Sequence, residues 1–108
     1  MNRQKQVLIC KLSECYLGFD IESINQVLQK KQAQINSGKN EIRYRGFAFP
    51  YIDLIQLFQL DDADPTLILL LNSVTGAFGI PIENIEGIID VENRFAECML
   101  PVGNNRNN

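Results

Sequence analysis

Short apolar runs separated by turn residues are the feature that most limits how this chain can fold. Most of the runs alternate apolar with polar or small side chains, and turn residues recur at roughly ten-residue intervals. Such alternation is typical of β-strands with one buried face, whereas a helix places its apolar residues three and four positions apart. The pattern predicts roughly five to seven short strands in an all-β fold, with a small β-barrel favoured over a doubly wound sheet.

One run differs because it is apolar at every position. Residues 67–71 read LILLL, which is expected of a strand covered on both faces and therefore at the centre of the core. Two hairpins are predicted. One joins residues 7–12 to 16–21, and the other joins the run 67–71 to 77–82 through a turn at 73–76. Residues 85–91 are expected to form a further strand.

Two segments before the central run have weaker patterns. Ile21, Ile24, Val27 and Leu28 recur at helix-like intervals, but most are β-branched, so a short turn leading into another strand fits equally well. Both alternatives stay open. Residues 29–41 carry Ile35 as their one large apolar side chain, and this composition predicts a solvated loop.

The segment before the central run combines strand and helix signals. Residues 42–52 alternate, and Gly46 stands where a strand pair could turn or bulge. Asp53 then occupies the N-cap position of a predicted short helix that carries Leu54 and Leu57. The sequence DDADP at 61–65 is expected to end that region in a turn.

Charge and hydropathy exclude several classes of partner. Ten basic and 13 acidic residues give a net charge of −3, so no strong attraction for nucleic acid is expected. The longest apolar run is far shorter than the roughly 20 residues that span a membrane, and residues 1–6 are too polar for a signal peptide. These features predict a cytoplasmic protein that does not insert into the membrane.

The inventory of reactive side chains disfavours catalysis. Histidine is absent, which removes the commonest general base and metal ligand. Cys10, Cys15 and Cys98 are an odd number, so free thiols are expected; Cys10 reads as a core residue, and no histidine can activate Cys15. The acidic residues at 61–64 lack the glycine and terminal glutamate of an EF-hand loop. We therefore predict a protein that is not an enzyme, with no catalytic residue, metal or cofactor.

Three segments share their order and spacing with a known family. They are YLGFDIESINQVL at 16–28, RYRGFAFPYIDL at 43–54 and TLILLLNSVTGAFGIPIENIEGIIDV at 66–91. The middle segment is the most specific, since Arg45, Gly46, Pro50, Asp53 and Leu54 occupy the places of the family motif. Over about residues 7–92 the sequence resembles the CheW-like domains of chemotaxis coupling proteins.

This resemblance implies an architecture and a function. CheW-like domains consist of two small SH3-like β-barrels and act as non-catalytic adaptors. They couple the cytoplasmic tip of a chemoreceptor to the regulatory domain of a CheA-type histidine kinase. The chain is therefore expected to be such an adaptor, recruited to membrane-associated receptor arrays.

Matching positions imply candidate binding residues. Arg45, Ile24, Gln26 and Ile88 correspond to receptor-binding positions, and Thr66 and Leu67 correspond to the start of a strand linked to kinase contact. Gln26 departs from the family, in which a glutamate is often found two positions later. The loss of that charge puts the choice or affinity of the receptor in question.

Two larger departures concern length. The connection between Leu28 and Arg43 is shorter than usual, and the fold is expected to be incomplete at its C-terminus, with one domain over residues 1–100 and a disordered tail over 101–108. An edge left unpaired would be a template for another chain, so a homodimer, a strand swap or permanent docking on a partner is predicted. The alternative function is a shortened CheW-like module that keeps one binding surface and acts as a competitor, cap or assembly element in another complex.

Overall fold

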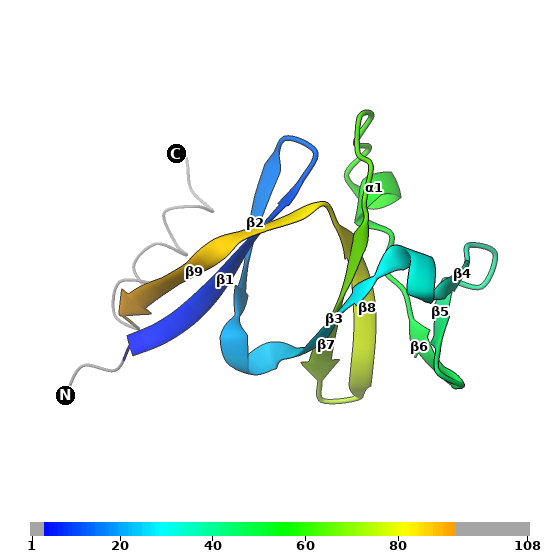
Figure 1. Cartoon of the computed structure of the whole chain (residues 1–108), viewed down its shortest axis with the longest axis horizontal. Coiled ribbons are helices and arrows are strands. Elements are labelled where there is room, and N and C mark those ends of the chain that lie inside the picture. The colour runs from blue at the N-terminus through cyan, green and yellow to red at the C-terminus, as the bar shows by residue number, and fades with distance from the viewer. Residues whose placement is uncertain (1–3, 93–108) are drawn as a thin grey trace, which may run out of the picture.

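Antiparallel pairing of short strands organises the chain, as the alternating pattern predicts. The computed structural model describes residues 4–92, and its elements are labelled in Figure 1. In chain order they are β1 (Gln4–Leu12), β2 (Cys15–Asp20), η1 (Ile21–Ser23), β3 (Ile24–Gln29), η2 (Lys30–Gln32), β4 (Gln34–Asn36), β5 (Glu41–Tyr44), β6 (Phe47–Pro50), α1 (Leu54–Leu57), β7 (Leu67–Ser73), β8 (Gly76–Ile82) and β9 (Asn84–Glu92).

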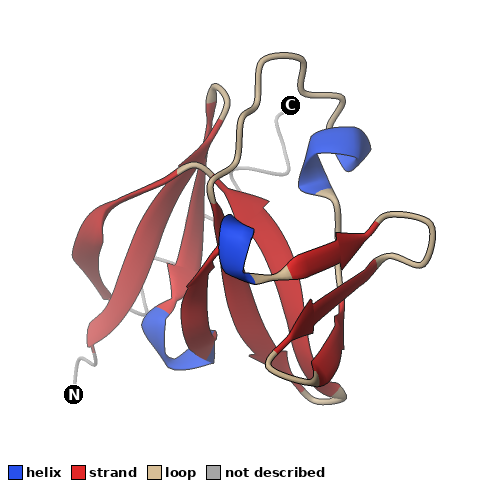
Figure 2. Ribbon diagram, turned by 45° about the vertical axis from the view of Figure 1, so that its right-hand side comes forward, coloured by secondary structure: helices blue, strands red, loops and turns tan. Residues whose placement is uncertain are grey.

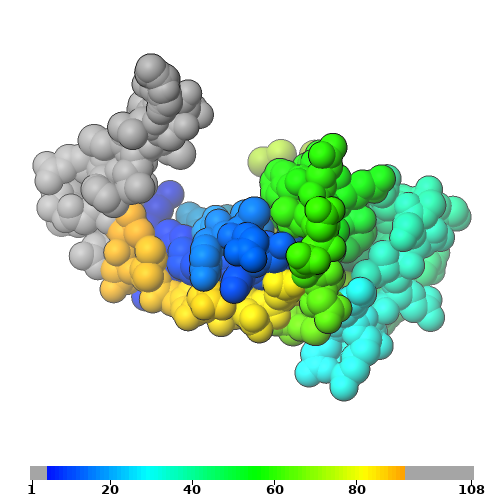
Figure 3. Space-filling model, turned by 90° about the horizontal axis from the view of Figure 1, so that it is seen from above, coloured from blue at the N-terminus to red at the C-terminus, as the bar shows by residue number. Residues whose placement is uncertain are grey.

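These strands form three sheets of three strands each, in the orders β2–β1–β9, β3–β7–β8 and β4–β5–β6. The hairpins β1–β2, β5–β6 and β7–β8 are local, whereas the β1–β9 pair joins the two ends of the described chain. The β3–β7–β8 sheet lies between the other two (Figures 1 and 2), and the space-filling view shows the N-terminal and C-terminal strands together at one end of the molecule (Figure 3).

The first core fills the space between the β2–β1–β9 sheet and one face of the central sheet. Its buried members come from β1, β7 and β8: Leu8, Cys10, Leu69, Leu71, Ile80 and Ile82. In β1 and β7 these residues occupy alternate positions, so they point to the same face of each strand. Cys10 is fully buried, which confirms its prediction as a core residue.

The second core lies between the other face of the central sheet and the β4–β5–β6 sheet. Its buried residues are Leu28, Ile42, Tyr51, Ile68 and Leu70. Ile68 and Leu70 alternate with the β7 residues of the first core, so β7 is buried on both faces. The prediction of a central strand at 67–71 is confirmed, and its apolar run follows from this double coverage.

The predicted fold class is confirmed at the level of a mostly β protein with one short α-helix. The predicted number of strands was wrong, because residues 4–92 alone form nine strands where roughly five to seven were expected. The sheets are not closed into barrels within residues 4–92. A single bridge between Tyr51 and Gly79, with the Ile52 N–H donating to the Gly79 carbonyl at 2.9 Å, links β8 to the chain leaving β6.

The prediction of a solvated loop over residues 29–41 was also wrong. Lys30–Gln32 form a 3-10 turn, and Gln34–Asn36 form β4, which pairs with β5. Ile35 packs partly buried against the second core. A single apolar side chain therefore suffices to anchor this strand, because the backbone hydrogen bonds come from its neighbour.

Two predictions that rest on local sequence signals agree with the structure. Of the two alternatives for residues 21–28, the turn leading into a strand is correct, as η1 followed by β3. Asp53 caps α1, its Oδ1 accepting from the Ile55 N–H at 3.1 Å and the Gln56 N–H at 3.3 Å. The proposed tail at 101–108 and Cys98 lie outside the described residues. Within them, no helix is long and apolar enough to cross a membrane.

Candidate functional site

Arg45 lies at the tip of the β5–β6 hairpin. The strands pair up to Tyr44 and Phe47, which leaves Arg45 and Gly46 as a two-residue turn. Both residues have positive φ, at 51° and 83°, as a type I′ turn requires. Glycine adopts this conformation freely, whereas an arginine is strained in it. The turn therefore presents the Arg45 side chain to solvent at an energetic cost.

The Arg45 guanidinium lies beside an aromatic ring and a hollow. The Arg45 Cζ atom lies 5.2 Å from the centroid of the Tyr44 ring, within the range of a cation–π contact. A shallow hollow of about 290 Å³ adjoins it, lined by Gln32, Gln34, Arg43, Tyr44, Arg45 and Gly46. All of these side chains except Tyr44 are exposed, so the hollow can accept an acidic group of a partner without a large rearrangement.

The other three receptor-binding candidates lie elsewhere. Ile24 begins β3 and packs partly buried against the first core, while Gln26 is exposed beyond an irregularity in the β3–β7 register. Ile88 is 53% exposed on β9, directly opposite the core residue Leu8. Ile24 and Ile88 thus belong to two different sheets, β3–β7–β8 and β2–β1–β9. The structure does not bring them together with Arg45, which belongs to the third sheet.

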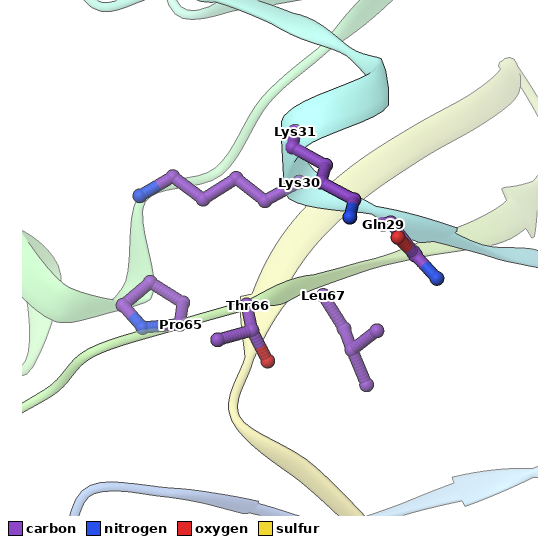
Figure 4. Close-up of a pocket in the computed structure, with 6 residues that line it drawn as sticks. All are labelled: Gln29, Lys30, Lys31, Pro65, Thr66 and Leu67. Carbon is purple, nitrogen blue, oxygen red and sulfur yellow. The ribbon is translucent and has the colours of Figure 1, made fainter.

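The two kinase-binding candidates lie together in a groove. Thr66 and Leu67 lead into β7, where Leu67 pairs with Gln29 at the end of β3. η2 lies across the groove, and its Lys30 N–H donates a 2.9 Å hydrogen bond to the Thr66 carbonyl. The groove has a volume of about 680 Å³ (Figure 4). It is larger than the hollow beside Arg45.

The side of the groove opposite Thr66 was missed at the level of the sequence. Gln29, Lys30 and Lys31 line it, but these residues were assigned to a solvated loop. The one available signal was the pair of adjacent lysines at the end of an apolar run. This signal is weak, because charged runs are usually solvated surface.

One carboxylate that does not line the groove forms hydrogen bonds to the segments around it. Glu83 follows β8, and its side chain accepts hydrogen bonds from the Ser13 N–H at 2.8 Å and the Asp64 N–H at 2.6 Å. Its carbonyl accepts from the Thr66 hydroxyl at 3.3 Å. The Asp64 and Ser13 N–H groups stabilise the charged form and hold the pKa of Glu83 below its ordinary value. Glu83 therefore ties the β1–β2 turn to the segment that enters β7.

Comparisons with known proteins show what this chain is similar to. The family description "CheW-like domain" matches residues 6–106. Among 14 matching chains of solved structures is the scaffolding protein TtCheW from Thermoanaerobacter tengcongensis, with a TM-score of 0.72 and 18% sequence identity. The match covers 85% of this chain and 65% of that one. A comparison with curated proteins gives no match.

Proposed function

The chain belongs to the CheW-like domain family, and from that premise we propose that it is a non-catalytic adaptor that couples chemoreceptors to a CheA-type histidine kinase. The receptor tip would contact Arg45, with Ile24, Gln26 and Ile88 as further contacts, and the regulatory domain of the kinase would contact Thr66 and Leu67. The adaptor would act in the cytoplasm at membrane-associated receptor arrays. Binding alone transmits the signal, so no cofactor is needed.

The conformation of Arg45 is the observation that carries this proposal. A left-handed residue with a side chain costs about 1 kcal/mol relative to glycine, yet an arginine occupies the turn beside a glycine that adopts the same conformation. Its exposed guanidinium makes no salt bridge within residues 4–92 and so gives little back to the fold. A strained, exposed arginine is better explained by binding than by stability.

The test separates these two roles. Asparagine tolerates positive φ, so Arg45→Asn keeps the turn and removes the guanidinium. We expect this variant to unfold at the same or a higher temperature and to lose binding to a chemoreceptor cytoplasmic fragment by on the order of 2 kcal/mol. Lys39→Gln, at the other turn of the same sheet, is the matched control. Equal receptor affinities for Arg45→Asn and Lys39→Gln would remove Arg45 from the site.

Kinase activity distinguishes coupling from the alternative function. The chain is added to a reconstituted mixture of receptor fragment and CheA-type kinase, and autophosphorylation is measured. A coupling protein raises the activity, whereas a module that keeps one binding surface competes and lowers it. No change in activity, with no recovery of the kinase on the immobilised chain, would exclude both functions.

The proposal of a homodimer or strand swap is tested separately. Within residues 4–92, β9 pairs with β1 along one edge and with no strand along the other, and Ile85, Ile88 and Ile89 are exposed on it. An open edge with apolar side chains favours association with another chain. Light scattering that shows a monomer at high concentration would contradict it.

A further inference from the structure

The groove between η2 and the start of β7 combines a positively charged wall with an apolar one. We propose that it binds an acidic segment of a partner protein in which a carboxylate side chain stands next to an apolar side chain. The proposal rests on the proposed function in one respect, namely that a partner protein docks at Thr66 and Leu67. It adds the chemistry by which that partner is recognised.

The positive wall is formed by Lys30 and Lys31, whose side chains extend over the groove in Figure 4. They are the only adjacent pair of basic residues in a chain with a net charge of −3. Both are exposed. The ion pairs among residues 4–92 are Lys5–Asp20 and Arg43–Glu41, so neither lysine is neutralised by a carboxylate of the described chain. Two free ammonium groups at one rim favour a partner with acidic side chains.

The opposite wall is apolar and fixed. Pro65 is buried, and Leu67 packs partly buried against the first core while its remaining surface lines the groove. A purely acidic partner would leave this surface in contact with water. An apolar side chain placed beside the carboxylate would cover it and gain about 25 cal/mol for each Å² removed from water.

The walls are held at a set separation. The Lys30 N–H is bonded to the Thr66 carbonyl, and Gln29 pairs with Leu67, so η2 cannot move away without breaking the β3–β7 ladder. From the other side, the Thr66 hydroxyl donates to the Glu83 carbonyl. A groove formed before the partner arrives loses little conformational entropy on binding.

These observations favour a peptide over a small anion. A phosphate site needs several N–H donors that converge on one point, whereas here the Lys30 N–H is already bonded within the fold. The two ammonium groups end flexible stems and supply charge without fixed geometry. A groove with one charged and one apolar wall instead matches a chain that carries both kinds of side chain.

The experiment uses the full chain labelled with ¹⁵N and a synthetic peptide in which glutamate alternates with leucine. We expect shifts concentrated in the backbone amides of Gln29, Lys30, Lys31, Thr66 and Leu67. Replacing Lys30 and Lys31 together by glutamine should weaken the peptide about tenfold, and raising the salt concentration should do the same. A peptide with glutamine for glutamate, and one with serine for leucine, should each bind more weakly than the parent.

Lys39→Gln provides the control, since Lys39 lies in the turn between β4 and β5 and does not line the groove. Equal weakening by Lys39→Gln and by the paired lysine substitution would mean nonspecific attraction and would overturn the proposal. Competition by inorganic phosphate or by anionic phospholipid vesicles as strong as that by the peptide would overturn it too, because the groove would then be an anion or membrane site.

The outcome is independent of whether the kinase is the partner. Peptide binding with the expected variant pattern, together with no recovery of the kinase, would refute the proposed function and leave the groove proposal intact. Recovery of the kinase without any effect of the peptide would refute the groove proposal alone.

Discussion

Glu83 offers the sharpest test of how the segment that enters β7 is held in place. Its carboxylate accepts two backbone hydrogen bonds, from Asp64 at 2.6 Å and Ser13 at 2.8 Å. Glutamine in its place keeps one carbonyl oxygen but turns an N–H₂ group toward the second donor, so Glu83→Gln loses one bond and weakens the other. The hydrogen bond from the Asp64 N–H is exposed to solvent, which reduces its contribution to the free energy of unfolding.

We expect Glu83→Gln to lower the free energy of unfolding by about 1.5 kcal/mol at pH 7. For a domain of this size that loss lowers Tm by roughly 6 to 12 °C, which circular dichroism resolves easily. Glu86→Gln is the matched control, because Glu86 is exposed on β9 and accepts no hydrogen bond among residues 4–92. Its effect should stay within about 0.5 kcal/mol.

The pH dependence of this difference has a defined sign. Folding lowers the pKa of Glu83, so the stabilisation is complete above the unfolded-state pKa of about 4.3 and is lost as the pH falls through the lower folded-state value. The gap between wild type and Glu83→Gln should therefore be constant near neutrality and close in acid. Equal melting temperatures at pH 7, or a gap that persists unchanged well below pH 4, would refute the reasoning.

Two further predictions concern the second core. A Cβ atom at Gly79 would overlap Cδ1 of the buried Ile42, so Gly79→Ala should lower the free energy of unfolding in urea by about 1 to 3 kcal/mol. Gly38→Ala is the control and should be close to neutral, because a Cβ atom there makes ordinary contacts on an exposed turn. Equal effects of the two substitutions would contradict this account. Burial, with a smaller effect of Asp53, raises the pKa of Tyr51 to about 12, so its stabilisation should be intact below pH 10 and lost as the pH rises toward 12. Phenolate absorbance should show a transition near pH 12 that Tyr51→Phe removes, and a titration curve that Tyr51→Phe leaves unchanged there would show the prediction to be wrong.

Several elements could be predicted because their causes are local. Apolar side chains at every position from Leu67 to Leu71 indicate a strand buried on both faces, whatever the rest of the chain does. Asp53 caps α1 through N–H groups two and three residues away. β4 could not be predicted in this way, since it has one apolar residue, Ile35, and depends on pairing with β5.

The candidate site also has residues that the sequence predicts and residues that only the tertiary structure brings into it. Family positions predict Arg45, Thr66 and Leu67 as binding residues from the sequence alone, because a motif is a local pattern. Only the tertiary structure places Thr66 and Leu67 across a groove from Lys30 and Lys31, since residues distant in the sequence meet there through the β3–β7 pairing. Sequence periodicity determines which face of a strand is buried, but strand pairing decides which surfaces share a groove, and that depends on contacts throughout the fold.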